Sequence, residues 1–545
     1  MLLPIFVLPG LWASRVLATP LAVPIVRLDN ATVTGENFGR VSSFLGIPFA
    51  KPPVGNLRFR LPQPIPPYTT SFSATSHGLS CPQQSVEVPI LIGAPKAVVE
   101  FFHNDIFNGG LPDSEDCLTL NVIKPRSATP GDKLPVIVWI FGGGFEIGGT
   151  STYDGGVIVR RSIELEAPVV YVSMNYRVSG FGFLGGREVK NARVANLGLH
   201  DQREALRWIQ KYIHNFGGDP SKVTIWGESA GAISVALHMV ANDGNHENLF
   251  RAGFMQSGAP IPVAGIENGQ KYYDNIVRDT GCSFHADTLE CLRNVPYKEL
   301  KKAINKSPSL FSYQSLNLAF LPRPDGDFLT DHPQKLVLEG KVAKIPFITG
   351  SCDDEGTPFA LSSLNITKSA EFKRYLKEVF LSPGVPESDL DGILLHYPQD
   401  VIQGSPFGTY ILNALTPQYK RIAAFMGDGV FQAPRRFFLH NLHDKQDTWA
   451  FLSKRQKYLP ILGSAHGTDI INVYGGGGMA DYLIRFAANL DPNSIKGIQW
   501  PKYDRKTRKL LTFNDDLISR ESITEDHYRV GAMEFLMNVT LRHPI

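Results

Sequence analysis

The sequence has few cysteines, few charges and no segment that resembles a linker. Its 545 residues include five cysteines, 19% are Asp, Glu, Lys or Arg, and the formal net charge at pH 7 is +2. Neither a C-x-x-C pair nor H-E-x-x-H occurs, so we expect no metal and no other cofactor. The small net charge excludes a strongly basic surface, and we expect no nucleic-acid partner. No Pro/Ser-rich stretch, charge run or internal repeat divides the chain, which favours one domain despite its length.

No apolar run is long enough to span a bilayer, so we expect no integral membrane anchor. The apolar segment 1–18, MLLPIFVLPGLWASRVLA, contains Pro4 and Pro9 and ends in the small-residue pattern Val16-Leu17-Ala18. We interpret it as a signal peptide cleaved after Ala18; an apolar N-terminal strand is the alternative. Residues 19–545 then form the mature domain, and the protein is expected to be secreted and extracellular.

An oxidising extracellular compartment allows five cysteines to form two disulfides and leave one free thiol. Cys282 and Cys291 are close in sequence and are interpreted as a local disulfide. By elimination Cys81 pairs with Cys117, and Cys352 stays reduced and buried. Four Asn-x-Ser/Thr triplets are candidate glycosylation sites: Asn30, Asn305, Asn365 and Asn538.

The most informative segment is 222–240, KVTIWGESAGAISVALHMV. Val223–Trp226 is a β-rich apolar run, Gly227–Gly231 follows without a spacer, and Ala232–Val240 is typical of a buried helix. The turn has the form G-x-S-x-G, whose glycines permit the sharp bend that exposes a nucleophilic serine hydroxyl. A bare match also fits an ordinary glycine turn. The strand before it and the helix after it favour Ser229 as a nucleophile.

A second glycine-rich turn follows the apolar run Leu134–Phe141, which we expect to be a central strand. A loop such as Gly142-Gly143-Gly144 can cradle a phosphate, but neither G-x-x-x-x-G-K-[ST] nor G-x-G-x-x-G with its later acid is present. In a hydrolase, the backbone N–H groups of such a loop stabilise the oxygen of a reacting carbonyl as it becomes negative. We favour that oxyanion-binding role.

Strand and helix patterns alternate along the chain. Apolar strands are predicted at Ala167–Met174, Ile345–Gly350 and Leu459–Leu462, and a helix at Leu199–Phe216. This alternation indicates an α/β fold with a large, mostly parallel central sheet and helices on both faces. Shorter β-rich segments over Ala31–Ile47 predict a small N-terminal antiparallel sheet.

A nucleophilic serine needs a histidine base and a carboxylate that orients the base. In α/β-hydrolases the acid follows the serine in sequence and the histidine comes last. Three acids occupy positions 353–355, in the loop after a predicted strand, and His466 lies further on among small residues. Spacing alone neither chooses among the three acids nor excludes His440 and His443.

The centre of loop 81–117 has helical character, KAVVEFFHNDIF over Lys96–Phe107. Its apolar residues recur at helical spacing: Val98, Val99, Phe102 and Ile106. A helix docked permanently on the core and a mobile lid over an active site are both compatible with this pattern.

These segments together resemble the type-B carboxylesterase/lipase family, and within it the secreted fungal lipases of the Candida rugosa type. The resemblance covers nearly the whole mature chain and is carried by FLGIPFAKPPVGNLRF, SEDCLTLNV, WIFGGGFEIGGTSTYD, VSMNYRVSGFGFL, VTIWGESAG, FRAGFMQSGA, LPRPDG, DDEGT, ILNALTPQYKR and LDPN. The sequence departs from the family pattern at Pro358-Phe359, around Val430–Pro434 and in the lid, which leaves the preferred acyl chain length open.

The resemblance implies an α/β-hydrolase fold in which Ser229 is the nucleophile, Glu355 the acid and His466 the base. It implies the same two disulfides and makes loop 81–117 a lid. The oxyanion-hole N–H groups would come from three residues: Gly143, Gly144 and Ala230. The implied function is a secreted lipase that hydrolyses long-chain fatty acid esters, such as triacylglycerols, through an acyl-enzyme at an oil–water interface. We expect a monomer or a weak dimer.

Two alternatives share this fold. A carboxylesterase or sterol esterase would use the same triad on other esters. A non-catalytic adhesion protein is more remote, because such relatives typically lose the nucleophile, whereas this sequence retains Ser229, Glu355 and His466.

Overall fold

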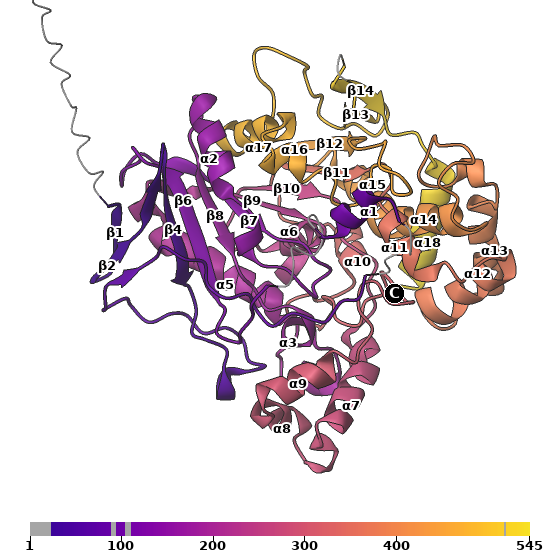
Figure 1. Cartoon of the computed structure of the whole chain (residues 1–545), viewed down its shortest axis with the longest axis horizontal. Coiled ribbons are helices and arrows are strands. Elements are labelled where there is room, and N and C mark those ends of the chain that lie inside the picture. The colour runs from indigo at the N-terminus through magenta and orange to yellow at the C-terminus, as the bar shows by residue number, and fades with distance from the viewer. Residues whose placement is uncertain (1–22, 89–93, 104–110, 517–518) are drawn as a thin grey trace, which may run out of the picture.

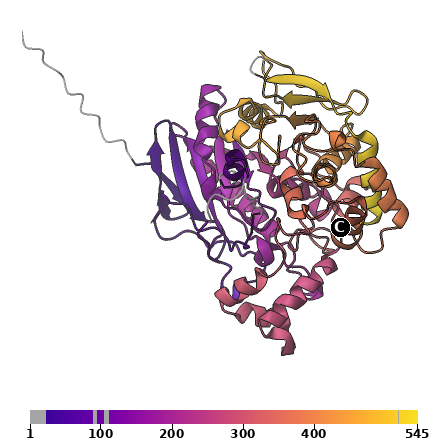
Figure 2. The same cartoon turned by 45° about the vertical axis from the view of Figure 1, so that its right-hand side comes forward.

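The computed structural model describes residues 23–88, 94–103, 111–516 and 519–545. The expected signal peptide, residues 1–18, lies outside the described residues. Strands run through the centre of the molecule and helices lie above and below them (Figure 1). Turning the molecule shows the N-terminal strands on one side and the C-terminal segments on the other (Figure 2). Among the described residues, no helix combines the length and the apolarity needed to cross a membrane.

Within the described part of the chain, one sheet of 11 strands has the order β14-β13-β12-β11-β10-β9-β7-β8-β6-β4-β3. The strands from β13 to β8 in that order are parallel to their neighbours, and the pairs at the two ends are antiparallel. The strands are β3 (Glu36–Phe38), β4 (Val41–Pro48), β6 (Thr119–Pro125), β7 (Leu134–Ile140), β8 (Val170–Met174), β9 (Gly218–Glu228), β10 (Ala252–Gln256), β11 (Phe347–Cys352), β12 (Thr448–Ser453), β13 (Lys509–Phe513) and β14 (Glu521–Glu525).

Helices cover both faces of this sheet, which explains why its central strands are apolar throughout. Every residue of β8 is buried, as are the last five residues of β7. Helices α2 (Gly155–Glu164) and α17 (Gly478–Asn489) pack together on one face. On the other face lie α5 (Leu197–Tyr212) and α6 (Ala230–Val240), joined by a hydrogen bond from Gln202 Nε2 to Ser234 Oγ (3.2 Å).

The predicted large, mostly parallel sheet is confirmed, and a small N-terminal sheet is present beside it. It contains β1 (Ile25–Leu28), β2 (Ala31–Thr34) and β5 (Phe72–Ser73); β1 and β2 are antiparallel, whereas β5 joins β2 in parallel. Residues 41–47 were expected in this small sheet but pair with β6 in the large one. Four consecutive buried residues at the start of β4 explain this, because both faces of that strand are covered.

The strand predicted at Leu459–Leu462 is wrong. The strand of this region is β12, which ends at Ser453, and residues 459–462 form turns. Pro460 has no N–H to donate to a sheet, and Ile461 has a φ of 68°, which a strand cannot contain. His466 is therefore separated from its strand by a longer loop than the sequence indicated.

Loop 81–117 is closed by a disulfide between its first and last residues. Helix α1 (Lys96–Glu100) begins after Pro95, and Val98 is its buried residue. Val98, Phe101 and Phe102 are buried, whereas Val99, which was expected on the same stripe, is 38% exposed. Ile106 lies outside the described residues.

Candidate active site

Ser229 lies at the turn between β9 and α6. Its backbone has φ 54° and ψ −124°, a strained conformation for a residue other than glycine. Ser229 N donates to Gln256 O (2.9 Å), which anchors the turn on β10. The flanking glycines are required by space: a Cβ on Gly227 would lie 2.4 Å from the carbonyl carbon of Gly231, and a Cβ on Gly231 would lie 1.9 Å from the oxygen of Ile140.

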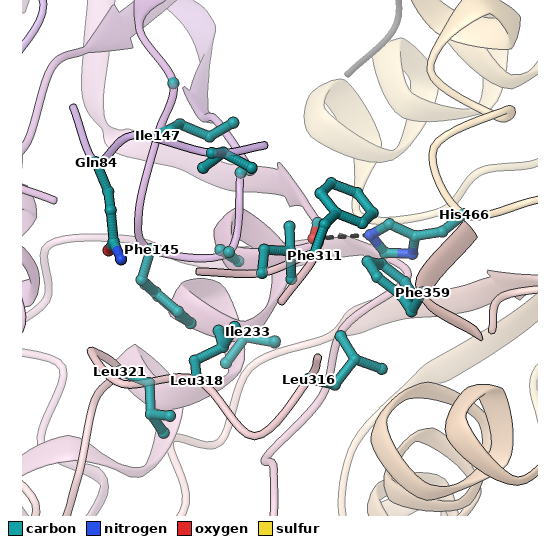
Figure 3. A pocket seen from close by; sticks show the side chains of 18 of the residues that line it. Gln84, Phe145, Ile147, Ile233, Phe311, Leu316, Leu318, Leu321, Phe359 and His466 are labelled. Atoms are coloured by element: carbon teal, nitrogen blue, oxygen red, sulfur yellow. Dashed lines mark hydrogen bonds between the residues drawn. The ribbon is translucent and has the colours of Figure 1, made fainter. Parts of the chain in front are cut away.

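The structure brings Ser229, His466 and Glu355 together in a hydrogen-bonded chain. His466 Nε2 is 2.7 Å from Ser229 Oγ, and His466 Nδ1 is 2.6 Å from Glu355 Oε2 (Figure 3 draws the first bond). The other carboxylate oxygen, Oε1, accepts the N–H of Cys352 at 2.7 Å. Because a carboxylate only accepts, Nδ1 carries the proton in the neutral imidazole, and Nε2 is free to accept the serine proton.

The surroundings of His466 favour its protonated form. Burial alone would lower the pKa of His466, but nearby acids outweigh it, above all the Glu355 carboxylate through its charge and its hydrogen bond, so the pKa lies above its ordinary value. The imidazolium that forms when His466 takes a proton is thereby stabilised.

Sequence reasoning missed two buried acids, Glu228 beside His466 and Glu146 after the glycine-rich turn. Glu228 Oε1 lies 3.3 Å from His466 Nε2, and burial raises the pKa of Glu228 to about 8. Burial also raises the pKa of Glu146 to about 8; its Oε2 accepts the N–H of Leu310 at 2.8 Å. Both residues stand inside the glycine motifs already identified, G-E-S-A-G and G-G-G-F-E, but a sequence gives no measure of how deeply an acid is buried.

Gly143, Gly144 and Ala230 border the same cavity as Ser229. Gly143 and Gly144 have φ values of 109° and 64°, which side-chain-bearing residues rarely adopt. A Cβ on Gly143 would lie 2.4 Å from the oxygen of Ile147, so the loop can close this tightly only with glycine. Ala230 is the first residue of α6, where backbone N–H groups have no partner within the helix.

The cavity in front of Ser229 has a volume of about 630 Å³ and mainly apolar walls. The ring centroid of Phe359 lies 5.2 Å from that of the His466 imidazole. The same Phe359 ring stacks on Phe311 with 5.9 Å between centroids. Phe311 in turn packs edge-to-face with Phe102 of loop 81–117, with 5.6 Å between ring centroids. Figure 3 shows both rings beside His466 and the aliphatic walls beyond them, which include Ile233, Leu316, Leu318 and Leu321.

The alternative acids and histidines have other contacts. Asp353 and Asp354 each accept a bond of 2.6 Å from Lys457 Nζ. His440 lies 3.1 Å from the hydroxyl of Tyr503, and His443 lies 4.0 Å from Asp504. None of these contacts involves Ser229, whereas those of Glu355 and His466 lead to it.

The structure contains the Cys81–Cys117 and Cys282–Cys291 disulfides, and the Cys352 thiol is buried. Burial raises the pKa of Cys352. Among the candidate glycosylation sites, Asn30, Asn365 and Asn538 are exposed. Asn305 is half-buried, and its side-chain oxygen accepts the N–H of Ser85 at 3.0 Å.

A serine on a sharp strand-to-helix turn of a mostly parallel sheet, with a histidine and an acid from later loops, defines an α/β-hydrolase. The chain belongs to the carboxylesterase family, whose model matches residues 22–531. It is a serine carboxylic-ester hydrolase.

Several similar proteins come from fungi. Lipase 4 of Diutina rugosa is 45% identical over 496 residues, which cover 88% of this chain and 90% of that protein. Secreted triacylglycerol lipase LIP1 of Gibberella zeae is 39% identical, with 96% and 92% covered. The crystal structure of Aspergillus niger EstA superposes with a TM-score of 0.81 at 28% identity, with 96% and 99% covered.

Proposed function

We propose that this chain is a secreted lipase that hydrolyses esters of long-chain fatty acids, with Ser229 as nucleophile, His466 as base and Glu355 as acid. The observation that carries the proposal is the hydrogen-bonded chain from Glu355 to Ser229, which ends in an apolar cavity large enough for an acyl chain. The names of the Diutina and Gibberella relatives support the lipase assignment.

Acylation begins when Ser229 Oγ attacks the ester carbonyl and its proton passes to His466 Nε2. The N–H groups of Gly143, Gly144 and Ala230 stabilise the tetrahedral oxyanion. Collapse of this intermediate breaks the ester bond, and His466 gives its proton to the leaving alcohol oxygen. Water then attacks the acyl-enzyme in the same way, releasing the fatty acid and restoring Ser229.

Residues 19–545 form one domain in this proposal, and loop 81–117 is its lid. The contact of Phe102 with Phe311 supports the lid role, because it packs the loop against the cavity wall. The substrate is a lipid at an oil–water interface. Asn30, Asn365 and Asn538 are the better candidates for glycosylation, since a glycan on Asn305 would disturb its bond to Ser85.

Two assays test the function and its rival. The purified protein should hydrolyse emulsified long-chain triglyceride, and its rate on a short ester should rise where that ester exceeds its solubility. A high rate on the dissolved ester and almost none on triglyceride would favour the carboxylesterase alternative, and activity only on sterol esters would identify a sterol esterase.

Single variants test the assigned roles. Ser229→Ala and His466→Ala should each lower kcat/KM by roughly 10⁴-fold or more, and the double variant should be scarcely worse because the two residues act as a unit. His440→Ala is the matched control and should retain activity. Equal loss in His440→Ala and His466→Ala, with both variants folded, would contradict the assignment, as would full activity in all of them; a folded wild type without activity on any ester would favour a non-catalytic protein.

A further inference from the structure

An apolar surface lies outside the cavity and the lid. Tyr410, Ile411 and Leu412 are consecutive residues with 71%, 70% and 67% of their surfaces exposed. Large apolar side chains exposed singly are common, but consecutive ones need an explanation. We call Tyr410, Ile411 and Leu412 the apolar loop patch.

The patch belongs to the edge of the sheet that carries the active site. Asp354, next to Glu355, accepts a bond from Phe407 N at 2.8 Å and another from Ser464 N at 2.9 Å. Asn413 Oδ1 accepts the N–H of Ile461 at 2.9 Å. The patch loop and the loop that presents His466 are therefore bonded to each other and to the acid loop.

A buried lysine fixes the shape of the patch loop. Lys420 is fully buried, and its Nζ donates to Thr409 Oγ1 at 2.8 Å, Tyr410 O at 2.7 Å and Leu412 O at 3.3 Å. A buried ammonium needs such partners, because desolvation would otherwise be unfavourable. Tyr410 and Asn413 have left-handed φ values of 52° and 63°, so the loop turns sharply on both sides of Ile411 and Leu412. The apolar side chains are thus held outward by a rigid support.

The patch also lacks charge. Residues 401–419 contain no Asp, Glu, Lys, Arg or His, so the loop offers neither ion pairs to a protein partner nor cations to an anionic headgroup. Tyrosine beside exposed aliphatic residues is typical of the boundary between water and lipid, where the ring is buried and the hydroxyl stays hydrated. This composition fits a neutral lipid surface.

We propose that the apolar loop patch docks the protein on a neutral lipid surface, and that it does so while the lid is still closed. The lid conceals its apolar side chains Val98, Phe101 and Phe102, whereas the patch exposes its own without any rearrangement. Docking by a rigid loop needs no ordering of the chain on contact. The active-site edge is thereby brought to the lipid before the lid opens. This inference rests on the proposed lipase function.

Binding is measured apart from catalysis by using the Ser229→Ala background, which leaves the lipid intact. The double variant Ile411→Asp/Leu412→Asp should bind phosphatidylcholine vesicles at least about tenfold more weakly in a flotation assay, because two apolar anchors are replaced by charges. The matched control, Leu395→Asp/Ile495→Asp, changes two residues that are 78% and 102% exposed elsewhere and should bind as the parent does. Addition of anionic phosphatidylserine should not strengthen binding.

Catalysis is then compared in proteins that retain Ser229. The patch variant should keep its rate on a dissolved short ester. On an emulsion, its rate should be below that of the wild type at low interfacial area and equal to it at high area.

Equal vesicle binding by the patch variant and its parent, or an equal loss of vesicle binding in the control variant, would overturn the proposal. A patch variant that only changes the sedimentation coefficient from dimer to monomer would assign the patch to self-association instead. Absence of triglyceride hydrolysis in the wild type would refute the lipase function, whereas the vesicle assay reports on the patch alone.

Discussion

At the residue scale, the least expected feature is a neutral acid beside His466. Glu228 has a pKa of about 8, mainly because it is buried, and its Oε1 lies 3.3 Å from His466 Nε2. At pH 7 it is therefore largely protonated and adds no charge next to Ser229. Ionisation above pH 8 places an anion 3.3 Å from His466 Nε2 and next to Ser229 in the chain; we expect its repulsion of the developing oxyanion to outweigh its attraction for the imidazolium.

This predicts an alkaline limb in the pH profile. We expect kcat/KM of the wild type to fall above about pH 8, by roughly tenfold at pH 9, as a single ionisation requires. Glu228→Gln, which stays neutral, should remove this fall. Glu146→Gln is the comparison, because Glu146 also has a pKa of about 8 but bonds to Leu310. The prediction is wrong if Glu146→Gln removes the alkaline fall and Glu228→Gln preserves it. The ionising group would then be Glu146, in the loop that contains Gly143 and Gly144.

The residue scale also marks where sequence reasoning stops. Ser229 is predictable because its geometry is local: a strand, two glycines and a helix occupy consecutive positions. Glu355 is not, because Asp353 and Asp354 are equivalent in sequence, and only the folded chain shows that Lys457 bonds both of them. The choice of Glu355 came from family resemblance.

At the element scale, long apolar or periodic segments of sequence predicted strands and helices correctly, whereas the short run Leu459–Leu462 did not. The strand at Leu134–Phe141 and the helix at Leu199–Phe216 were found almost in full, as β7 and as α5 with its short continuation to Phe216. The run Leu459–Leu462 is equally apolar but too short for periodicity to separate a strand from a buried turn.

Helix α1 and the residues that follow it, in the proposed lid, have an apolar face that can be tested. Phe102 is buried against Phe311, so Phe102→Asp should destabilise the closed lid in water and raise the rate on a dissolved short ester. The same charge should weaken insertion into lipid, so the jump in rate across the solubility limit should shrink. Val99→Asp is the control, because Val99 is 38% exposed and lies on the outer side. Equal behaviour of the two variants would make α1 part of the fixed cavity wall.

At the scale of the whole molecule, a buried ionic cluster helps to tie the C-terminal segment to the rest of the fold. Asp526 follows β14 and is fully buried; its carboxylate accepts bonds from Arg435 and Arg436 of α15 (Ala433–Leu442). Burial alone would raise the pKa of Asp526, but the two guanidinium groups outweigh it and hold the pKa below its ordinary value. The last strand and α18 (Val530–Arg542) are thereby tied to the core helices.

Asp526→Asn should therefore destabilise the whole molecule. Removing the carboxylate leaves two buried guanidinium groups without their counter-charge, which costs about 3–5 kcal/mol. The control is Asp447→Asn, at the exposed pair with Lys502, which should cost less than about 1 kcal/mol.

The pH dependence of stability provides a second test. Because the pKa of Asp526 is lower in the folded than in the unfolded protein, its ionic bonds stabilise the fold fully above the unfolded-state pKa of about 3.9. This stabilisation is lost as the pH falls through the folded-state pKa. The difference in unfolding free energy between wild type and Asp526→Asn, measured by denaturant titration, should be constant from pH 5 to 8 and shrink below pH 4. If unfolding is irreversible, the half-life at a fixed temperature replaces the free energy. A difference below about 1 kcal/mol at pH 7 would mean that the two arginines find other partners when Asp526 is neutral, and that the C-terminal segment is held by its apolar contacts instead.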